Sequence, residues 1–226
     1  MAAAPDSGHR AASGPTMLKK LLIGLATLLA GFLVFVTTRP AECHVERSAT
    51  VAAPTDVVFA QVNDFHAWAG WSPWAKRDPA MTTTFDGAVA GVGAQYGWAG
   101  NDDVGEGKMT ISAGTPNRQL AIHMVYTRPF PATNETTFTF TPAGDKTDVK
   151  WAMVVKNNFM MKGMSVFMDM DQMVGKDFET GLNQLKRVAE AEVAKAAEEA
   201  GNKAASAAPR APAEPTSPAA ETARRP

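Results

Sequence analysis

The spacing of hydrophobic and polar positions changes three times along this chain. Residues 21–36 read LLIGLATLLAGFLVFV, an uncharged apolar run directly after Lys19 and Lys20. From residue 44, apolar and polar residues alternate in short segments separated by Gly, Asn or Pro. From residue 160, apolar residues recur three and four positions apart. These periods predict an apolar helix, then a series of strands, then an amphipathic helix.

The apolar run is long enough to cross a bilayer. A helix needs about 20 residues to span the hydrocarbon core, and residues 18–38 reach this length if both lysines extend their ammonium groups to the headgroups. We therefore predict a transmembrane anchor within residues 17–40. The basic residues before the run predict a cytoplasmic N-terminus, although Arg39 opposes this orientation. The rest of the chain would then lie on the periplasmic, or extracytoplasmic, side of the inner membrane.

A cleaved secretory signal peptide is the alternative for this segment. Its apolar core is long for such a peptide, and TTRPAEC after the run offers no A-x-A cleavage site. Met17 is an alternative start, because MLKKLLIGL is a typical opening for an anchor. Residues 1–16 are accordingly predicted to be a disordered leader.

Seven strands and two short helices are expected after the anchor. The first strand covers 44–51, where Val45, Ala49 and Val51 fall on alternating positions. A helix opens at Pro54, and a second short helix covers 64–68. The remaining strands are predicted at 81–87, 94–100, 104–114, 119–127, 132–142 and 147–156. Their short connections favour an antiparallel meander.

A single amphipathic helix is predicted over residues 160–188, about 42 Å long at about 1.5 Å per residue. Beyond it, Ala, Glu and Lys can continue a helix, but the Pro-spaced remainder lacks apolar residues large enough to offset the entropy of ordering. Residues 189–226 are therefore predicted to be an Ala/Pro-rich, disordered tail, and residues 44–188 to be one folded domain.

Composition and charge remove several classes of function. The net charge is −1 with both signs mixed along the chain, so we predict no nucleic-acid partner. The single cysteine, Cys43, cannot form an intramolecular disulfide or a cysteine-based metal site. We find no metal-ligand spacing, phosphate-binding loop or nucleophile triad, and predict no metal, no cofactor and no catalytic residue.

Two segments carry a resemblance to a known family. Residues 45–74 read VERSATVAAPTDVVFAQVNDFHAWAGWSPW, and residues 156–186 read KNNFMMKGMSVFMDMDQMVGKDFETGLNQLK. With the order of elements, they resemble the START-like (SRPBCC, helix-grip) superfamily, in its polyketide cyclase-like branch. The resemblance covers about residues 44–188. It implies an α+β fold in which a curved antiparallel sheet wraps around a long C-terminal helix, here preceded by one transmembrane helix.

In such a fold the sheet and the long helix enclose a cavity. Strand parity predicts that the inward, ligand-binding residues of the sheet are Tyr96, Trp98, Met109, Ile111, Ile122, Met124, Phe138, Phe140, Trp151 and Met153. The helix adds Met160, Met164, Phe167 and Met168. Methionine is unbranched and polarizable, so this wall could adapt to different apolar ligands. The alternative is that these methionines simply fill a core.

The motif WSPW, with Trp71 and Trp74, allows two interpretations. Its rings could form a lid or contact a membrane interface, and packing of the short helices against the sheet explains them equally. His123 is expected to face solvent, because its parity is opposite to that of Ile122 and Met124.

The fold alone does not determine the activity, because this fold hosts lipid carriers, cyclases and hydrolases. The first hypothesis is a membrane-anchored domain that binds a small hydrophobic or lipid ligand. The second is a cyclase-like or hydrolase-like enzyme, which would need a polar group such as Tyr126, Glu135 or Asp171 in the cavity. The third is a scaffold or interaction domain with a filled core. A buried ionisable group in an open cavity would favour the enzyme.

Overall fold

The computed structural model describes residues 14–156, 162–163, 166 and 169–207. Helix α1 (Gly14–Thr37) precedes strand β1 (Glu42–Val51), helix α2 (Thr55–Asn63) and the short helical segments η1 (Phe65–Ala67), α3 (Trp68–Trp71) and η2 (Trp74–Lys76). Six strands follow: β2 (Thr82–Gly87), β3 (Ala94–Ala99), β4 (Glu106–Thr115), β5 (Gln119–Arg128), β6 (Ala132–Ala143) and β7 (Lys146–Lys156). Helix α5 (Met170–Ala207) ends the described chain.

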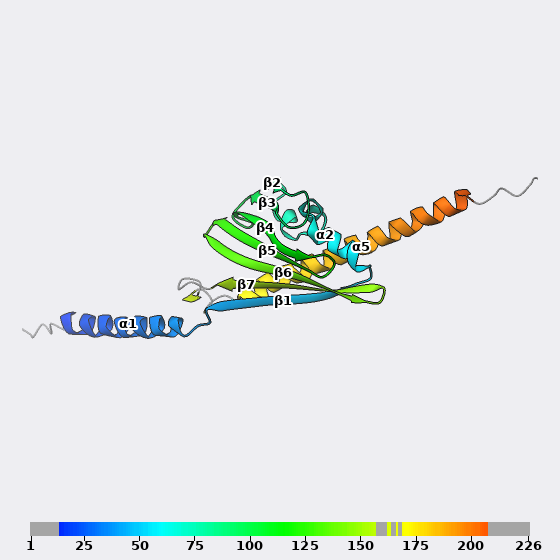
Figure 1. Cartoon of the computed structure of the whole chain (residues 1–226). Coiled ribbons are helices and arrows are strands. Elements are labelled where there is room, and N and C mark those ends of the chain that lie inside the picture. The colour runs from blue at the N-terminus through cyan, green and yellow to red at the C-terminus, as the bar shows by residue number, and fades with distance from the viewer. Residues whose placement is uncertain (1–13, 157–161, 164–165, 167–168, 208–226) are drawn as a thin grey trace, which may run out of the picture.

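The strands form one seven-stranded sheet in the order β1-β7-β6-β5-β4-β3-β2, and every neighbouring pair is antiparallel. Strands β2 to β7 follow one another as a meander, and β1 pairs with β7. Figure 1 shows the sheet curving, with α5 passing across it and extending beyond its edge. The predicted α+β helix-grip fold, with an apolar helix at its N-terminus, is confirmed.

The predicted strand limits agree with the structure because turn residues separate the strands. At the β6–β7 turn, Gly144 has a φ of 69°, a left-handed conformation that glycine adopts without the steric cost that a Cβ would add. Pro54 stands immediately before α2, as expected for a residue that lacks a free N–H and fixes its own φ.

The predicted start of the long helix at residue 160 is wrong. Residues 162–163 are helical, but Val166 lies in a turn and α5 begins only at Met170. Asp169 caps the helix, because its side chain accepts a hydrogen bond from the backbone N–H of Gln172 at 3.0 Å and its carbonyl accepts one from Met173 at 3.0 Å. Such capping satisfies amide groups that have no partner inside the helix.

At its other end α5 continues to Ala207, well past residue 188. Ala, Glu and Lys have high helix propensity, and Lys195 and Glu199 form an ion pair one turn apart at 3.8 Å. The predicted disordered tail therefore has a helical first part, and its remainder, residues 208–226, lies outside the described residues, as does most of the predicted leader.

The sheet and α5 bury one tightly packed region, which we call the filled half: strands β1, β6 and β7 with α5. At its centre the Trp151 ring stacks on Phe178, with ring centroids 4.0 Å apart, and contacts Phe138 and Trp71. The Trp151 indole N–H donates to the Thr136 hydroxyl at 3.2 Å. Gly181 permits this approach, because a Cβ there would lie 2.8 Å from the Trp151 ring.

An ion-pair cluster fixes the start of α5 on β1. Arg47, on the inward face of β1, donates to Glu179 at 2.8 Å and to Asp171 at 3.0 Å. The hydrogen bond from Arg47 lowers the pKa of the Asp171 carboxyl below its ordinary value. The α5 backbone approaches this guanidinium at Gly175, where an added Cβ would overlap it.

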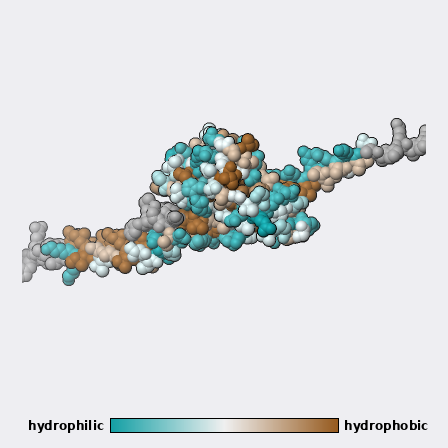
Figure 2. Space-filling view, viewed as in Figure 1, coloured by the Kyte–Doolittle hydropathy of each residue, from teal (hydrophilic) through white to brown (hydrophobic). Residues whose placement is uncertain are grey.

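Helix α1 contains a stretch, Met17–Thr37, that is long and apolar enough to cross a membrane. Most of its surface is not covered by the rest of the protein, and Leu21 and Leu28 are 70% and 74% exposed. Figure 2 shows this apolar surface continuing along the extended N-terminal helix. A signal sequence near an N-terminus also meets this criterion of length and apolarity.

Candidate functional site

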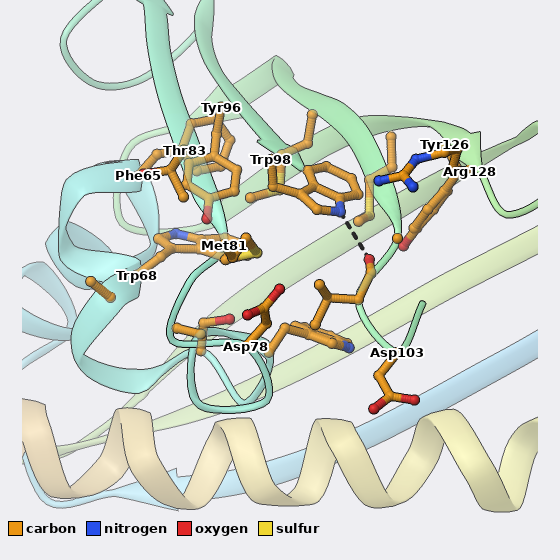
Figure 3. A pocket seen from close by; sticks show the side chains of 18 of the residues that line it. Phe65, Trp68, Asp78, Met81, Thr83, Tyr96, Trp98, Asp103, Tyr126 and Arg128 are labelled. Atoms are coloured by element: carbon orange, nitrogen blue, oxygen red, sulfur yellow. Dashed lines mark hydrogen bonds between the residues drawn. The ribbon is translucent and has the colours of Figure 1, made fainter. Parts of the chain in front are cut away.

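A cavity of about 380 Å³ lies between strands β2 to β5 and the segment from η1 to η2 (Figure 3). Its sheet wall consists of Thr83, Phe85, Tyr96, Trp98, Met109, Met124 and Tyr126. Its helical wall includes Phe65, Trp68, Ser72, Trp74 and Ala75, followed by the buried Asp78, and its mouth includes Met81, Asp102, Asp103, Val104, Arg128 and Pro129. Because seven of these residues are Phe, Tyr or Trp, we call it the aromatic cavity, and we call β2 to β5 with η1, α3 and η2 the open half.

The predicted ligand-binding residues fall into two groups, one that lines the cavity and one that is buried in the core. Four of them, Tyr96, Trp98, Met109 and Met124, line the aromatic cavity. Six others are buried in the core instead: Ile111, Ile122, Phe138, Phe140, Trp151 and Met153. Met160, Met164, Phe167 and Met168 lie outside the described residues. Ligand contact by any of these residues stays a prediction.

Strand parity placed the sheet residues on the inward face, but it could not tell which of them would be covered. No described residue of α5 lines the cavity. The helix packs instead on β1 and on Trp151 of β7, and α2 contacts β6 and β7. The cavity remains between β2 to β5 and the short segments η1 to η2. The predicted cavity between sheet and long helix is therefore displaced toward the short helices.

Sequence reasoning missed the helical wall and the mouth. Phe65 and Trp68 belong to the segment DFHAW, where an aromatic pair three apart gave a usable signal. Asp78 and Met81 lie in the connection between η2 and β2, and Asp102 and Val104 in the β3–β4 connection. Nothing in the periodicity of either connection distinguishes these residues from ordinary loop positions.

Aromatic contacts hold the sheet wall. Tyr96 and Trp98 stack with centroids 6.2 Å apart, and Tyr126 meets Trp98 edge-on at 5.4 Å. The Trp98 indole N–H donates to the Val104 carbonyl at 3.1 Å, a bond visible in Figure 3. Gly107 leaves room for this ring, because a Cβ there would lie 2.6 Å from it. The wall is therefore held in place without a ligand.

The two tryptophans of WSPW have different surroundings. Trp71 is fully buried, and its indole N–H donates to the Gln61 carbonyl at 3.0 Å. Trp74 packs edge-on against Trp151 with centroids 5.9 Å apart and also lines the aromatic cavity. Packing thus explains Trp71, and Trp74 joins the filled half to the cavity wall.

Three polar side chains reach the interior of the cavity. Asp78 is only 9% exposed, and its carboxylate accepts backbone hydrogen bonds from Ala80 at 3.0 Å and Asn101 at 2.8 Å. Burial raises the pKa of Tyr126 to about 12 and raises that of Tyr96 as well. In the described chain neither tyrosine hydroxyl has a hydrogen-bond partner, so both are available to a bound molecule.

The other proposed catalytic groups lie away from the cavity. His123 forms an ion pair with Glu135 on the outer face of the sheet, where both side chains are partly exposed, as strand parity predicted for His123. Asp171, in the first turn of α5, is paired with Arg47 of β1 and does not line the cavity, so its suggested place there is wrong. Tyr126 alone among the three candidates lines the cavity.

Comparisons with known proteins give a family and a general fold. A search of curated proteins found no match. Among solved structures, the Zhui aromatase/cyclase from Streptomyces sp. R1128 is 16% identical, with a TM-score of 0.49 over 67% of this chain and 96% of that one. A Thermobifida fusca protein is 22% identical, with a TM-score of 0.49 over 65% and 92% of the two chains. CalU16 from Micromonospora echinospora is 18% identical, with a TM-score of 0.44 over 73% and 95%.

Likenesses at this level of identity carry no functional argument. The family model described as "Polyketide cyclase / dehydrase and lipid transport" matches residues 42–190, which include every strand, the short helices and the buried part of α5. The chain therefore belongs to the polyketide cyclase/dehydrase and lipid transport family.

Proposed function

We propose that this protein is a membrane-anchored domain that binds a small hydrophobic molecule in the aromatic cavity. The observation that carries this proposal is a preformed, largely apolar space in a fold whose other half is fully packed. Ligand sites are typically concave, mostly apolar and equipped with a few polar groups. At about 380 Å³, the cavity falls within the usual range of about 300–1,000 Å³.

The exposed apolar helix α1 supports a membrane location. Burying about 20 apolar residues in a bilayer is strongly favourable, whereas leaving them in water exposes a surface far larger than soluble domains usually tolerate. We propose that Met17–Thr37 stays in the membrane as an anchor and that the domain lies on the extracytoplasmic side of the inner membrane.

The sheet register supports a functional link between anchor and cavity. Glu42, where β1 starts, pairs with Lys156 at the end of β7. At the same end of the sheet, Ala132 of β6 pairs with Tyr126 of β5. Glu106, where β4 starts, pairs there with Arg128 of β5. The mouth loops 100–105 and 129–131 therefore lie at the end where the anchor enters. Only residues 38–41 separate α1 from β1, a reach of at most about 18 Å. Phe130, 58% exposed, lies in one of these loops.

This arrangement supports ligand exchange between the cavity and the bilayer. An apolar molecule would leave the membrane close to the mouth and would cross little water.

The test uses the full chain in phosphatidylcholine nanodiscs with an environment-sensitive apolar dye. We expect saturable dye fluorescence above that of empty nanodiscs, and loss of it in Ala75→Leu, which places a larger side chain at the cavity wall. Ala204→Leu, at an exposed position near the end of α5, is the control and should bind dye normally. Equal fluorescence from wild type and Ala75→Leu would contradict binding in this cavity.

Anchoring is tested separately by washing membranes with alkaline carbonate. We expect the full chain to stay in the membrane and Leu28→Arg, which places a charge in the apolar run, to be released more readily. Release of the unmodified chain, or recovery of a shortened chain that begins after residue 38, would contradict the anchor and favour a cleaved signal.

One observation keeps an enzyme as the second candidate: a buried carboxylate, Asp78, and the Tyr126 hydroxyl share the open cavity. Two backbone N–H groups already donate to the Asp78 carboxylate, and the high pKa of Tyr126 disfavours its use as a general base near neutral pH. Mass analysis of the bound molecule after incubation would separate the candidates, because a binding domain returns it unchanged and an enzyme does not.

A further inference from the structure

The charge in the aromatic cavity is unbalanced. Three aspartates, Asp78, Asp102 and Asp103, line it together with one basic residue, Arg128. Arg128 is already engaged, since it donates to the Glu106 carboxylate at 3.0 Å and to the Gly100 carbonyl at 3.0 Å. The cavity and its mouth therefore carry a net negative charge.

Asp78 is the innermost of these charges. It is 9% exposed, and Figure 3 shows its carboxylate directed into the cavity, toward Met81 and Trp98. No basic side chain of the described residues forms an ion pair with it. Its sequence neighbour Arg77 pairs instead with Asp177 on α5. Burying a carboxylate is costly unless it is both hydrogen-bonded and paired with a positive charge.

The backbone bonds to Asp78 meet only the first of these requirements. The N–H groups of Ala80 and Asn101 occupy one acceptor site on each oxygen, and an ionised carboxylate has about four such sites in all. The remaining sites and the uncompensated charge are available inside the cavity. The two backbone bonds hold two loops together, but neither bond supplies a counter-charge to the carboxylate.

The walls around Asp78 suit a positive charge. Aromatic rings attract cations through the negative face of their π-systems, most strongly Trp and then Tyr. Trp68, Trp74, Trp98 and Tyr96 all line the same space. An anionic molecule would meet the exposed carboxylates of Asp102 and Asp103 at the mouth and Asp78 inside.

We propose that the cavity selects an apolar or aromatic molecule that carries an amine or quaternary ammonium group, with Asp78 as its counter-charge. This inference rests on the proposed function, because it names the ligand class of the same cavity. The apolar body contacts the aromatic and methionine side chains, and the cationic group lies beside the Asp78 carboxylate. Anionic amphiphiles such as fatty acids are excluded by charge.

The test compares three probes of nearly equal size and different charge: 1-naphthylmethylammonium, 1-naphthylmethanol and 1-naphthoate. Each is titrated calorimetrically into the full chain in phosphatidylcholine nanodiscs, and the signal from empty nanodiscs is subtracted. We expect the ammonium probe to bind at least tenfold more tightly than the alcohol, and the naphthoate to bind most weakly.

The variant that tests the role of Asp78 is Asp78→Asn. Asparagine keeps one carbonyl oxygen for a backbone bond and removes the charge, so the ammonium and the alcohol should then bind within about threefold of each other. Asp145→Asn, an exposed aspartate in the β6–β7 turn, is the control and should keep the wild-type preference.

If Asp78→Asn does not fold, the preference of the wild-type chain still decides the ligand class. The location of the bound ammonium probe is then given by nuclear Overhauser contacts. We expect to observe them between the methylene group of 1-naphthylmethylammonium and the Met81 methyl group. Absence of those contacts would overturn the assignment to this cavity.

The outcomes separate the two proposals. If the alcohol or the naphthoate binds as tightly as the ammonium and Ala75→Leu abolishes binding, the cavity is a hydrophobic site and the charge inference is wrong. If no probe binds and the apolar dye also fails to bind, the proposed function is wrong and the inference is overturned with it.

Discussion

The filled and open halves share one sheet and one strand parity, yet their interiors differ. In the filled half, Trp151 is 2% exposed and contacts aromatic rings from the sheet, α3 and α5. In the open half, Tyr96 and Trp98 occupy equivalent inward positions and border an empty space. The difference lies in the covering element, because α5 packs on the first half, and short helical segments span the second.

This comparison shows that an inward apolar residue is not by itself a ligand-binding residue. Packing in protein interiors is dense, so a space of this size persists only where the surrounding side chains are held by other contacts. Here the Trp98–Val104 hydrogen bond, the Trp98–Tyr126 contact and the Asp78 bonds to two backbone segments supply that support.

The largest predicted difference between the halves comes from removing a tryptophan in each. Trp151→Ala should lower the free energy of unfolding by about 3–5 kcal/mol, because it leaves a void among packed rings. Trp98→Ala enlarges an existing cavity and should cost less than half as much. Denaturant unfolding of both variants measures this, and equal losses would contradict the division into two halves.

Adding the same group to each half should give a smaller contrast, with the filled half again losing more stability. Ala189→Leu, at a fully buried position on α5, should destabilise the fold by about 1–3 kcal/mol through overpacking. Ala75→Leu extends into the cavity and should change stability by less than about 1 kcal/mol while blocking ligand binding. A large loss of stability in Ala75→Leu would mean that the open half is as tightly packed as the filled half.

Two glycines of α5 separate its docked part from its free part. Gly175→Ala should destabilise the protein by about 1 kcal/mol, because the new Cβ displaces Arg47 from Asp171 and Glu179. Gly201→Ala meets no atom within 4 Å and should stabilise the helix by up to about 1 kcal/mol. Thermal unfolding measures the change in stability of both variants. Stabilisation by Gly175→Ala would show that Arg47 does not fix the helix at this position.

The same displacement should raise the pKa of Asp171. That pKa is lowered in the folded protein, so Asp171 contributes stability above its unfolded pKa and loses this contribution as the pH falls through the folded value. Carboxyl titration by NMR should therefore show Asp171 moving toward its ordinary pKa in Gly175→Ala and staying low in Gly201→Ala.

The smallest effect concerns the tyrosines, and it reports on the open half alone. The chain has two tyrosines, and both line the aromatic cavity. Because the pKa of folded Tyr126 is about 12 and that of the unfolded residue about 10, the folded state keeps its proton longer and stability falls as the pH rises between these values.

Absorbance at 295 nm measures this titration, with circular dichroism as the check that the fold is intact. We expect less tyrosinate in the folded protein than in denaturant at pH 10.5, because the pKa of both tyrosines is raised in the fold. Tyr126→Phe should remove the component near pH 12. Full titration of the folded protein near pH 10 would show that the tyrosines are solvated, contrary to the raised pKa of both side chains.

The order and limits of the strands could be predicted from sequence because alternation and turn residues are local signals. Inward positions such as Met109 and Trp151 followed from the same alternation. The start of α5 could not be predicted, because the apolar spacing from Met160 to Val174 continues across Asp169, and only the capping bonds show the break. The position of the open space depends on how α5 crosses the sheet, which periodicity does not encode.

The contribution of the loops was the least predictable part of the site. Asp78 and Asn101 are 23 residues apart in sequence, and the hydrogen bond between the Asn101 amide and the Asp78 carboxylate joins two connections that carry no periodic pattern. A buried carboxylate of this kind is identified only when its neighbours are known.

The most direct test of the central claim, that the open half binds an apolar molecule, is native mass spectrometry of the full chain released from its own membranes. We predict a co-purifying small apolar molecule that is removed by organic extraction and is absent from Ala75→Leu prepared in parallel. Wild-type protein that carries no co-purifying molecule and also fails to bind the apolar dye in nanodiscs would contradict the account. That result would favour an interaction domain whose aromatic cavity binds no small molecule.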